Sequence, residues 1–516
     1  MRRSLPPRPR LEYPDDLSPS SGSQPVHAGL NDRPMIKKLC CSALLLVSVC
    51  CFSQTSAPLG PLPDSDQVSW HHLEFYLFVH FGPNTFTDLE WGKGNEQEAV
   101  FNPAELDCGQ WCRIAKAAGA KGIIITAKHH DGFCLWPSAY SRHTVKESPW
   151  RNGRGDVLAE LSKSCRESGL LFGVYLSPWD RNHPQYGTPG YNEVFVNMMI
   201  EVSRRYGPLF EFWWDGANGE GPNGKKQVYD WGLFERTLRK NAPHTVIFSD
   251  IGPDIRWVGN ERGKAGDPDW DFLDTAGFAR GAGAPPTDTL NHGNVWGKHW
   301  IPPECDVSIR PGWFYHSAED GQVKRPEDLF RLYLESVGRG ANLLLNVPPN
   351  RKGLISPYDS AALMGFAKLR KQFTHPSLLQ GSGVTISTRS HSGDTHTLID
   401  GNEDSFLSLG GDFTQNYVEF VFQKPIAFNC LVLQEPVRMG QRISSFRIEM
   451  RTIADSLIVL SGQTIGRKRI LVFPGQWLRS MRIRVTGAKG EPLLSECQAF
   501  YIRTQLPEPE RKLNKS

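Results

Sequence analysis

A single carboxylate ends an aromatic run in the middle of the chain. The stretch PLFEFWWDGANG (208–219) has the composition of a short buried strand followed by turn residues, and Asp215 stands at their junction. Removing a charge from water at such a place is costly unless another group pairs with it. The ordinary alternative is a turn or helix-cap aspartate, because Asp-Gly pairs usually serve turns. Asp215 is therefore a candidate for chemistry, to be weighed against the rest of the chain.

Two glutamates could work together with Asp215. Hydrolysis of a glycosidic bond needs two carboxyl groups, one as nucleophile or base and the other protonated to assist the leaving group. Glu261 in DIRWVGNERG and Glu304 in PPECDVSIRPGWFYH both fall in segments that we interpret as aromatic loops rich in Gly and Pro. Either glutamate could equally be an ordinary surface residue of a loop. Spacing alone does not choose between them.

Three histidines form a second group of candidates. His129 and His130 are adjacent in TAKHHDGFCLWPSAYSRHTV, and His80 follows an earlier apolar run. Three imidazoles could bind a metal ion, but neighbouring side chains of a strand point to opposite faces, so His129 and His130 are poorly placed to chelate one ion. A neutral imidazole can equally hydrogen-bond a sugar hydroxyl. We favour hydroxyl binding over metal binding.

The elements that carry these residues alternate along the chain. From about residue 70 to 350, short apolar runs alternate with amphipathic helical stretches, which indicates parallel strands joined by helices. Polar residues stand at or just past the ends of the runs, and in a (β/α)8 barrel that rim assembles the chemistry. No Gly-rich phosphate loop follows the first run, which disfavours a doubly wound sheet. The strand candidates are YLFVHFG, GIIITAKHHDG, LLFGVYLSPWD, LFEFWWDGANG, TVIFSDIGPD and NLLLNVPPN, and the rim residues are His80, His129, His130, Asp131, Tyr175, Asp215, Asp250 and Asn346.

The pattern changes near residue 380. Short alternating strands separated by turns replace the helices from there on. We therefore predict an α/β fold class, with a (β/α)8-like (TIM) barrel catalytic domain over residues 60–375 and a C-terminal β-sandwich domain over residues 380–505.

The first 60 residues differ in composition from the rest. Residues 1–34 are rich in Pro, Arg, Ser and Asp without an apolar period, so we expect them to be disordered or upstream of the true start. The segment MIKKLCCSALLLVSVCCFSQ has a basic start and an apolar run too short to span a bilayer comfortably, which predicts a signal peptide over residues 35–53 and export to a periplasm. Cleavage before Cys50 or Cys51, giving a lipoprotein, is the weaker option. We expect no transmembrane segment elsewhere.

Charge and cysteine content exclude other classes. The formal net charge is +3 over 516 residues and no run of Lys or Arg marks a nucleic-acid surface, so we expect no nucleic-acid partner. Four of the 11 cysteines lie in the predicted signal peptide, and the other seven are scattered, which is no disulfide framework.

Seven sequence blocks together resemble a known enzyme family. In order they are FVHFGPNTFTDLEWG, AKHHDGFCLWPS, GVYLSPWDRN, FEFWWDGANG, DIRWVGNE, ECDVSIRPGWFYH and NLLLNVPPNRKGLI. They resemble a retaining α-L-fucosidase of glycoside hydrolase family 29 over roughly residues 65–370, and the tail is similar to the β-sandwich that often follows that domain. The TDLEWG and ECDVSIRPGWFYH blocks resemble the branch that prefers α-1,3/4-linked fucose.

The resemblance implies a function and a set of roles. The function is exo-acting, retaining hydrolysis of terminal α-1,3/4-linked L-fucose from fucosylated oligosaccharides and glycoconjugates, with no metal and no organic cofactor. Asp215 would be the nucleophile and Glu261 the acid/base, with Glu304 as second choice. Two alternatives stay open: a catalytically inactive protein that binds fucose or glycans, and a glycosidase for another sugar. The implied substrate-binding residues are His80, Glu90, Trp91, His129, His130, Tyr175 and Trp313.

Overall fold

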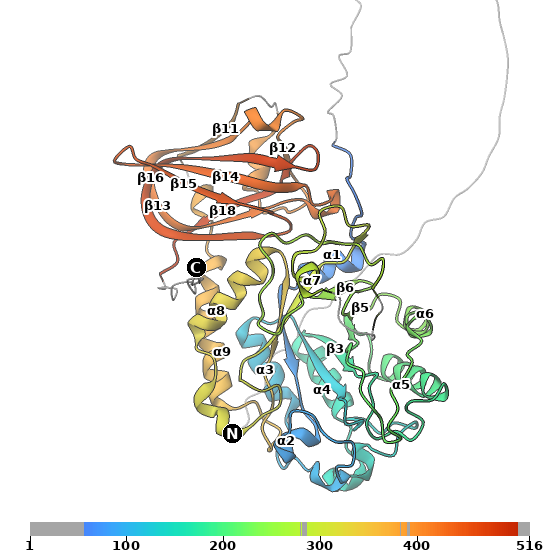
Figure 1. Cartoon of the computed structure of the whole chain (residues 1–516). Coiled ribbons are helices and arrows are strands. Elements are labelled where there is room, and N and C mark those ends of the chain that lie inside the picture. The colour runs from blue at the N-terminus through green and yellow to red at the C-terminus, as the bar shows by residue number, and fades with distance from the viewer. Residues whose placement is uncertain (1–55, 279, 281–285, 382, 390–392, 504–516) are drawn as a thin grey trace, which may run out of the picture. The chain divides into compact units, whose positions relative to one another are not determined.

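The structure is a computed structural model that describes residues 56–278, 280, 286–381, 383–389 and 393–503. The predicted disordered segment 1–34 and the predicted signal peptide 35–53 lie outside the described residues. Within the compact unit Ser56–Ser516, a closed barrel of strands is followed by antiparallel sheets (Figure 1). No helix of the described ranges is both long and apolar enough to cross a membrane.

Eight parallel strands close into the barrel, in the spatial order β1-β10-β9-β6-β5-β4-β3-β2. Consecutive strands along the chain are mostly neighbours, as in a (β/α)8 barrel. Together with the C-terminal sheet domain, this confirms the predicted fold class. The strands are β1 (Phe75–Val79), β2 (Gly122–Lys128), β3 (Leu171–Leu176), β4 (Glu211–Trp213), β5 (Val246–Ser249), β6 (Ile255–Trp257), β9 (Pro303–Ser308) and β10 (Asn342–Asn346), and the short pair β7 (Phe272–Leu273) and β8 (His299–Trp300) lies outside the barrel.

Helices begin and end where the sequence supplies caps. The carboxylate of Asp107 accepts a hydrogen bond from the backbone N–H of Gln110 at 2.9 Å, which starts α3 (Cys108–Ala118), and Gly119 ends it with a left-handed φ of 81°. Asp156 and Gly169 cap α4 (Val157–Ser168) in the same way. The other α-helices of the described residues are α1 (Ser65–His71), α2 (Pro83–Thr87), α5 (Gly190–Tyr206), α6 (Trp231–Asn241), α7 (Thr287–His292), α8 (Pro326–Glu335) and α9 (Pro357–Arg370).

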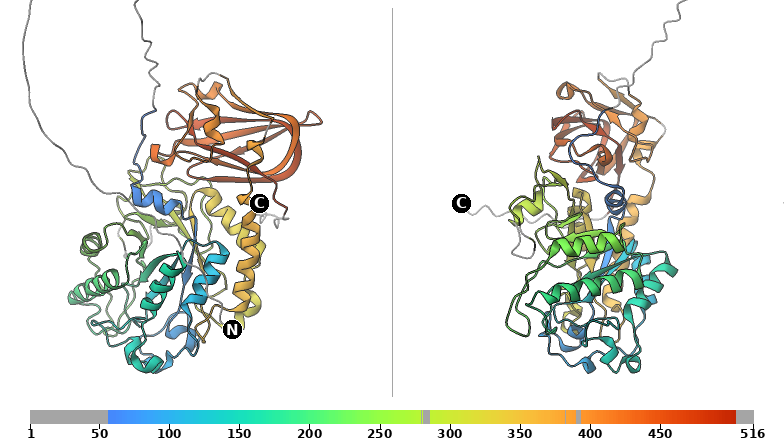
Figure 2. Two further views of the ribbon diagram at one scale, coloured as in Figure 1. Left: turned by 180° about the vertical axis from the view of Figure 1, so that it is seen from behind. Right: turned by 90° about the vertical axis from the view of Figure 1, so that its right-hand side faces the viewer.

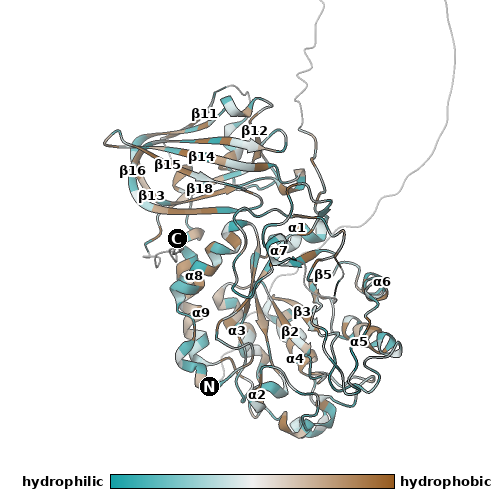
Figure 3. Ribbon diagram, in the orientation of Figure 1, coloured by the Kyte–Doolittle hydropathy of each residue, from teal (hydrophilic) through white to brown (hydrophobic). Residues whose placement is uncertain are grey.

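Alternate side chains of the first barrel strand enter two different cores. Tyr76 and Phe78 belong to an aromatic cluster inside the barrel. Phe75 and Leu77 belong to the larger cluster formed with the surrounding helices. Both faces of the strand are therefore buried, and Figure 3 shows barrel strands coloured as mostly hydrophobic. By the same alternation His80, two residues after Phe78, continues the inner row.

Two barrel strands, β6 and β9, fall in segments that were predicted as loops. That prediction was wrong because both strands carry charged residues. Arg256 of β6 is buried and donates hydrogen bonds to the carbonyl oxygen of Leu290 and to Asp269. In β9, Glu304 and Asp306 are both buried. Buried charged side chains within a strand remove the apolar signal by which a buried strand is recognised.

Antiparallel sheets form the C-terminal domain. The main sheet has the order β11-β13-β16-β14-β15, with β18 paired to β13, and a separate pair, β12 and β17, packs into the same hydrophobic core. Figure 2 shows these strands from two further sides. Their bounds are β11 (Val384–Thr388), β12 (Leu407–Ser408), β13 (Val418–Gln434), β14 (Ile443–Thr452), β15 (Leu457–Gly462), β16 (Arg469–Ala488), β17 (Leu493–Leu494) and β18 (Glu496–Phe500).

Candidate active site

A pocket of about 170 Å³ brings together residues that follow five of the barrel strands. His80 comes directly after β1, and His129 and His130 come directly after β2. The structure thus places distant segments of the sequence around one hollow at the C-terminal rim. All of the predicted site residues except Glu304 line it: His80, Glu90, Trp91, His129, His130, Tyr175, Asp215, Glu261 and Trp313.

Asp215 is held by two hydrogen-bond donors and remains partly open to the pocket. Its Oδ2 accepts from the Tyr175 hydroxyl at 3.0 Å, and its Oδ1 accepts from the backbone N–H of Ala217 at 2.7 Å. The second contact is the turn interaction that an Asp-Gly pair ordinarily makes. His130 Nε2 lies 3.8 Å from Oδ2, and the side chain is 24% exposed. A fixed carboxylate open to a pocket is arranged to act as a nucleophile or base.

Glu261 is an exposed residue four positions beyond β6. Its Oε2 accepts a hydrogen bond from the indole N–H of Trp313 at 3.3 Å. An indole N–H can only donate, so it favours the unprotonated oxygen of the carboxyl group and leaves the other oxygen for a proton. Glu261 and Asp215 line the same pocket, which is the arrangement that a pair of catalytic carboxyls requires.

Glu304 lies in the barrel interior, outside the pocket lining. It is fully buried in β9, accepts hydrogen bonds from the Tyr76 hydroxyl and, at 2.8 Å, from the indole N–H of Trp213. Burial raises its pKa to about 7. Glu211, also fully buried, is the neighbouring carboxyl group of this interior cluster. The position supports a structural role for Glu304 beneath Trp213, which does line the pocket.

The pocket histidines are neutral. Burial lowers the pKa of His80 to about 3 and that of His130 to about 4. His80 Nδ1 lies 2.8 Å from the amide oxygen of Asn346, an acceptor, so Nδ1 carries the proton and Nε2 can accept. His130 Nδ1 lies 2.8 Å from the Ser177 hydroxyl, which donates its own proton to the carbonyl oxygen of Trp179. Nδ1 of His130 therefore also donates.

His129 completes the histidine wall and stacks on Tyr175, with ring centroids 5.7 Å apart. Burial, together with the charges of neighbouring basic groups, lowers its pKa well below the ordinary value. Across the described residues, no group of three or more His, Cys, Asp or Glu side chains is arranged to hold a metal ion. Neutral imidazoles are suited to hydrogen bonds with uncharged hydroxyl groups.

Trp91 and Glu90 occupy different parts of the pocket. Trp91 is 57% exposed and meets His130 and Trp179 edge-on, with ring centroids 5.7 Å apart in both pairs. The Glu90 carboxylate accepts hydrogen bonds from the backbone N–H groups of Trp313 at 2.7 Å and Phe314 at 3.2 Å. Trp91 is thus an exposed ring at the pocket, whereas Glu90 holds the segment that forms its wall.

Two carboxyl groups of this region were not predicted as site residues. Asp306 lines the pocket from β9, and its Oδ1 accepts from the indole N–H of Trp257 at 2.9 Å. Asp250 follows β5 and was recognised only as a rim residue; burial and the charge of Asp215 raise its pKa to about 7. The alternation of Glu304, Asp306 and Ser308 would have revealed Asp306, had ECDVS been read as a strand.

A second hollow of about 290 Å³ adjoins the first and shares several lining residues with it, among them Asp215, Glu261 and Asp306. Asp250 and Trp257 line only the second hollow. The two carboxyls that were predicted to be catalytic therefore stand where the two hollows meet.

Comparison with known proteins agrees with this geometry. The model of the family described as alpha-L-fucosidase matches residues 65–372. Alpha-L-fucosidase 1 of Arabidopsis thaliana is 41% identical over 447 residues, covering 85% of this chain and 87% of the plant protein. A putative alpha-L-fucosidase structure from Bacteroides thetaiotaomicron has a TM-score of 0.81 at 34% identity, covering 87% of this chain and 99% of that one.

A further solved relative is described as a complex with a sugar. The family 29 fucosidase of Ruminococcus gnavus in complex with fucose superposes with a TM-score of 0.79 at 29% identity, covering 88% of this chain and 97% of that one. The assignment to a family rests on the match to the family model over more than half of the chain, together with the barrel and its pocket. This chain belongs to the alpha-L-fucosidases of glycoside hydrolase family 29.

Proposed function

We propose that the protein is an exo-acting, retaining α-L-fucosidase that removes terminal α-1,3/4-linked L-fucose from glycans. The observation that carries the proposal is the joint presence of Asp215 and Glu261 on one small pocket with three neutral histidines. Ligand pockets commonly measure about 300–1,000 Å³. At about 170 Å³ this one suits a single terminal sugar.

The proposed reaction has two displacements. Asp215 attacks the anomeric carbon while the bond to the glycosidic oxygen breaks, and Glu261 gives its proton to that oxygen. Water then attacks the fucosyl ester, Glu261 takes a proton from this water, and Asp215 leaves as a carboxylate. Two inversions retain the configuration of fucose. The mechanism requires carboxyl groups about 5–5.5 Å apart.

The other pocket residues are proposed to recognise the sugar. With Nδ1 protonated, the Nε2 atoms of His80 and His130 accept hydrogen bonds from fucose hydroxyls. The Tyr175 hydroxyl orients Asp215. The ring of Trp313 offers an apolar wall to the sugar ring, and Trp213 also lines the pocket.

The surroundings of the pocket support a branched substrate. The second hollow, of about 290 Å³, meets the pocket at Asp215 and Glu261, where the leaving group of the reaction must lie. The exposed ring of Trp91 adds a surface for a further sugar. Both features would contribute only to substrates that carry sugars beyond the scissile bond, which supports the preference for branched glycans over simple aryl fucosides.

A panel of substrates tests this proposal. We expect kcat/KM for fucose release to be higher on Lewis-type α-1,3/4-fucosylated oligosaccharides than on α-1,2-fucosylated ones or aryl fucosides. Comparable values on all three classes would contradict the linkage preference alone. Absence of fucose release from every substrate by folded protein would contradict the activity itself.

We also propose that the predicted organisation of the chain holds: a signal peptide over residues 35–53, cleavage near Ser53, export to a periplasm, a catalytic domain over 60–375 and a sandwich over 380–505. The basic start at Lys37 and Lys38 and the short apolar run support export.

For the C-terminal domain we propose that it braces the barrel. Glu74, directly before β1, forms ion pairs with Arg467 and Lys468, directly before β16.

A further inference from the structure

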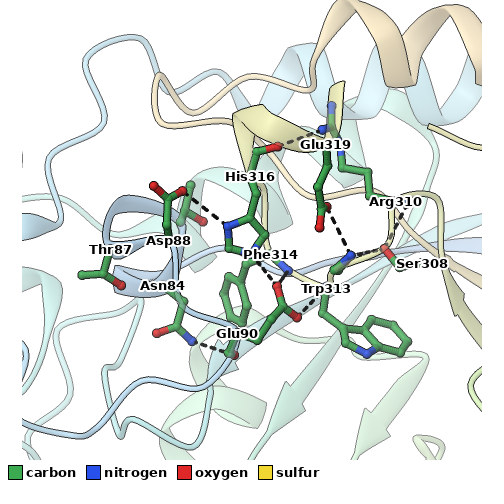
Figure 4. A network of polar contacts seen from close by, with 12 residues as sticks. Asn84, Thr87, Asp88, Glu90, Ser308, Arg310, Trp313, Phe314, His316 and Glu319 are labelled. Carbon is green, nitrogen blue, oxygen red and sulfur yellow. Dashed lines mark hydrogen bonds and ion pairs between the residues drawn. The ribbon is translucent and has the colours of Figure 1, made fainter. Parts of the chain in front are cut away.

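The segment that carries Trp313 is tied to a single carboxylate. Glu90 Oε2 accepts from the backbone N–H of Trp313 at 2.7 Å, and Oε1 accepts from the backbone N–H of Phe314 at 3.2 Å (Figure 4). His316 Nε2 lies 2.6 Å from the same Oε1. Three of the roughly four acceptor positions of a carboxylate are thereby filled by one short segment of chain.

His316 is itself placed between two carboxylates. Its Nδ1 lies 3.4 Å from Asp88 Oδ1, on the side opposite Glu90 (Figure 4). Although burial opposes it, the hydrogen bonds to Glu90 and Asp88 and the charge of Glu319 raise the pKa of His316. The imidazolium is thus favoured, and a cation facing Glu90 makes a charge-assisted hydrogen bond. Arg351 pairs with Asp88 from the other side, and the guanidinium of Arg310 donates to the carbonyl oxygen of His316 at 3.3 Å.

The backbone of Trp313 is fixed from both sides. Glu90 holds its N–H, and Asn346 Nδ2 donates to its carbonyl oxygen at 2.7 Å. The Glu90 carboxylate also packs closely against Gly312, because a Cβ atom added to this glycine would lie 2.6 Å from Glu90 Oε1. The indole N–H of Trp313 then reaches Glu261 Oε2 at 3.3 Å. A continuous chain of contacts therefore runs from His316 through Glu90 and Trp313 to Glu261.

We propose that Glu90 and His316 are positioning residues that place the indole N–H of Trp313 against Glu261, and so orient this carboxyl for proton donation. The inference rests on the proposed function, in which Glu261 is the acid/base. Held in this way, Oε2 of Glu261 faces the indole, and the proton that leaves with the glycosidic oxygen resides on Oε1. Glu90 acts here through Trp313, whereas the resemblance to the family implies a direct role in binding the substrate.

The dependence of the rate on the leaving group distinguishes a positioning role of Glu90 from direct binding of the substrate. The test measures kcat and KM for a series of aryl α-L-fucosides whose phenols span a wide range of pKa. Protonation by a general acid raises the rate only when the departing oxygen is basic. General acid catalysis then contributes roughly 100- to 10,000-fold in rate. For Glu90→Gln and His316→Gln we expect kcat/KM to fall roughly 10-fold or more on poor leaving groups, a partial loss of that contribution. On dinitrophenyl fucoside we expect little change.

Two further variants make the test independent of folding defects at Glu90. Trp313→Phe keeps Glu90 and an aromatic ring while it removes the indole N–H, so it must show the same dependence on the leaving group. The double variant Glu90→Gln/Trp313→Phe must be no worse on poor leaving groups than the worse single variant, because both break one chain of contacts. Glu105→Gln, at an exposed ion pair with Lys352, is the matched control and should behave as wild type.

The outcomes that overturn the inference are distinct from failure of the proposed function. Equal losses across all leaving groups for Glu90→Gln, with raised KM, would show that Glu90 contacts fucose instead. Unchanged kinetics in Glu90→Gln, or additive losses in the double variant, would equally overturn it. Wild-type protein that hydrolyses no fucoside would contradict the proposed function rather than this inference.

Discussion

Replacing Glu304 by Gln should change the pH dependence of stability and leave the chemistry of the pocket in place. Glu304 is fully buried and accepts hydrogen bonds from Tyr76 and Trp213. Gln is nearly isosteric with the protonated acid: its oxygen can accept from the Trp213 indole, and its NH2 group, like the protonated acid, can donate to the Tyr76 hydroxyl oxygen. The variant therefore removes the ionisation of Glu304 with little change in packing.

The size of the effect follows from the pKa. Burial raises the pKa of Glu304 from 4.5 to about 7, and a difference of this size corresponds to about 3 kcal/mol. Because the folded-state pKa lies above the unfolded-state value, the stabilisation is complete below pH 4.5, declines as the pH rises through about 7 and is absent above it. Burial and the charge of Glu304 also raise the pKa of the neighbouring Glu211 well above its ordinary value.

Urea unfolding of both proteins between pH 4 and pH 8.5 measures the difference. The free energy of unfolding of Glu304→Gln, relative to wild type, should rise by up to about 3 kcal/mol from the acid to the alkaline end. Parallel stability curves would refute the reasoning. The same preparations should retain the wild-type leaving-group dependence. A loss confined to poor leaving groups, with parallel stability curves, would make Glu304 the acid/base in place of Glu261.

The remaining predictions concern the ion pairs of the C-terminal domain and export. Although burial opposes it, the charges of Lys468 and Arg467 lower the pKa of Glu74, so its contribution to stability is present above pH 4.5 and is lost as the pH falls. Glu74→Gln should cost roughly 3 kcal/mol at pH 7 in urea unfolding, the cost of removing one partner of a buried pair, and a cost near zero would contradict the bracing role. For export, N-terminal sequencing of protein from its native host should find a mature chain that begins near Gln54. A cytosolic product with intact Met1 would contradict that proposal.

Periodicity and strand-end chemistry predicted much of the fold from sequence. Six of the eight barrel strands were recognisable because their apolar runs are bounded by turns, as in the run that ends at Asn346. β6 and β9 were missed because they carry the charged residues Arg256, Glu304 and Asp306, which are buried in the fold, and burial is tolerated only when such groups are paired or neutral. Sequence-based prediction counts such residues as loop residues.

Sequence-based reasoning predicted most of the residues that line the pocket, whereas their contacts with one another could not be predicted. Rim positions identified Asp215 and the histidines, because residues after parallel strands converge at one end of a barrel. Glu261 is exposed whereas Glu304 is fully buried, and the spacing of residues in the sequence does not reveal this difference. The contacts of Glu90 also could not be predicted, since its partners, Trp313 and Phe314, are more than 200 residues away in the sequence and meet it only in the folded chain.

The configuration of azide products tests the central assignment most directly. In Asp215→Gly, azide can take the place of the missing nucleophile, and we expect restored turnover with a fucosyl azide of inverted configuration. In Glu261→Ala, azide should intercept the covalent intermediate and give a fucosyl azide of retained configuration, with losses concentrated on poor leaving groups. NMR spectra of the two products distinguish the anomers. A retained product from Asp215→Gly, or an inverted one from Glu261→Ala, would contradict the assignment of Asp215 as nucleophile and Glu261 as acid/base.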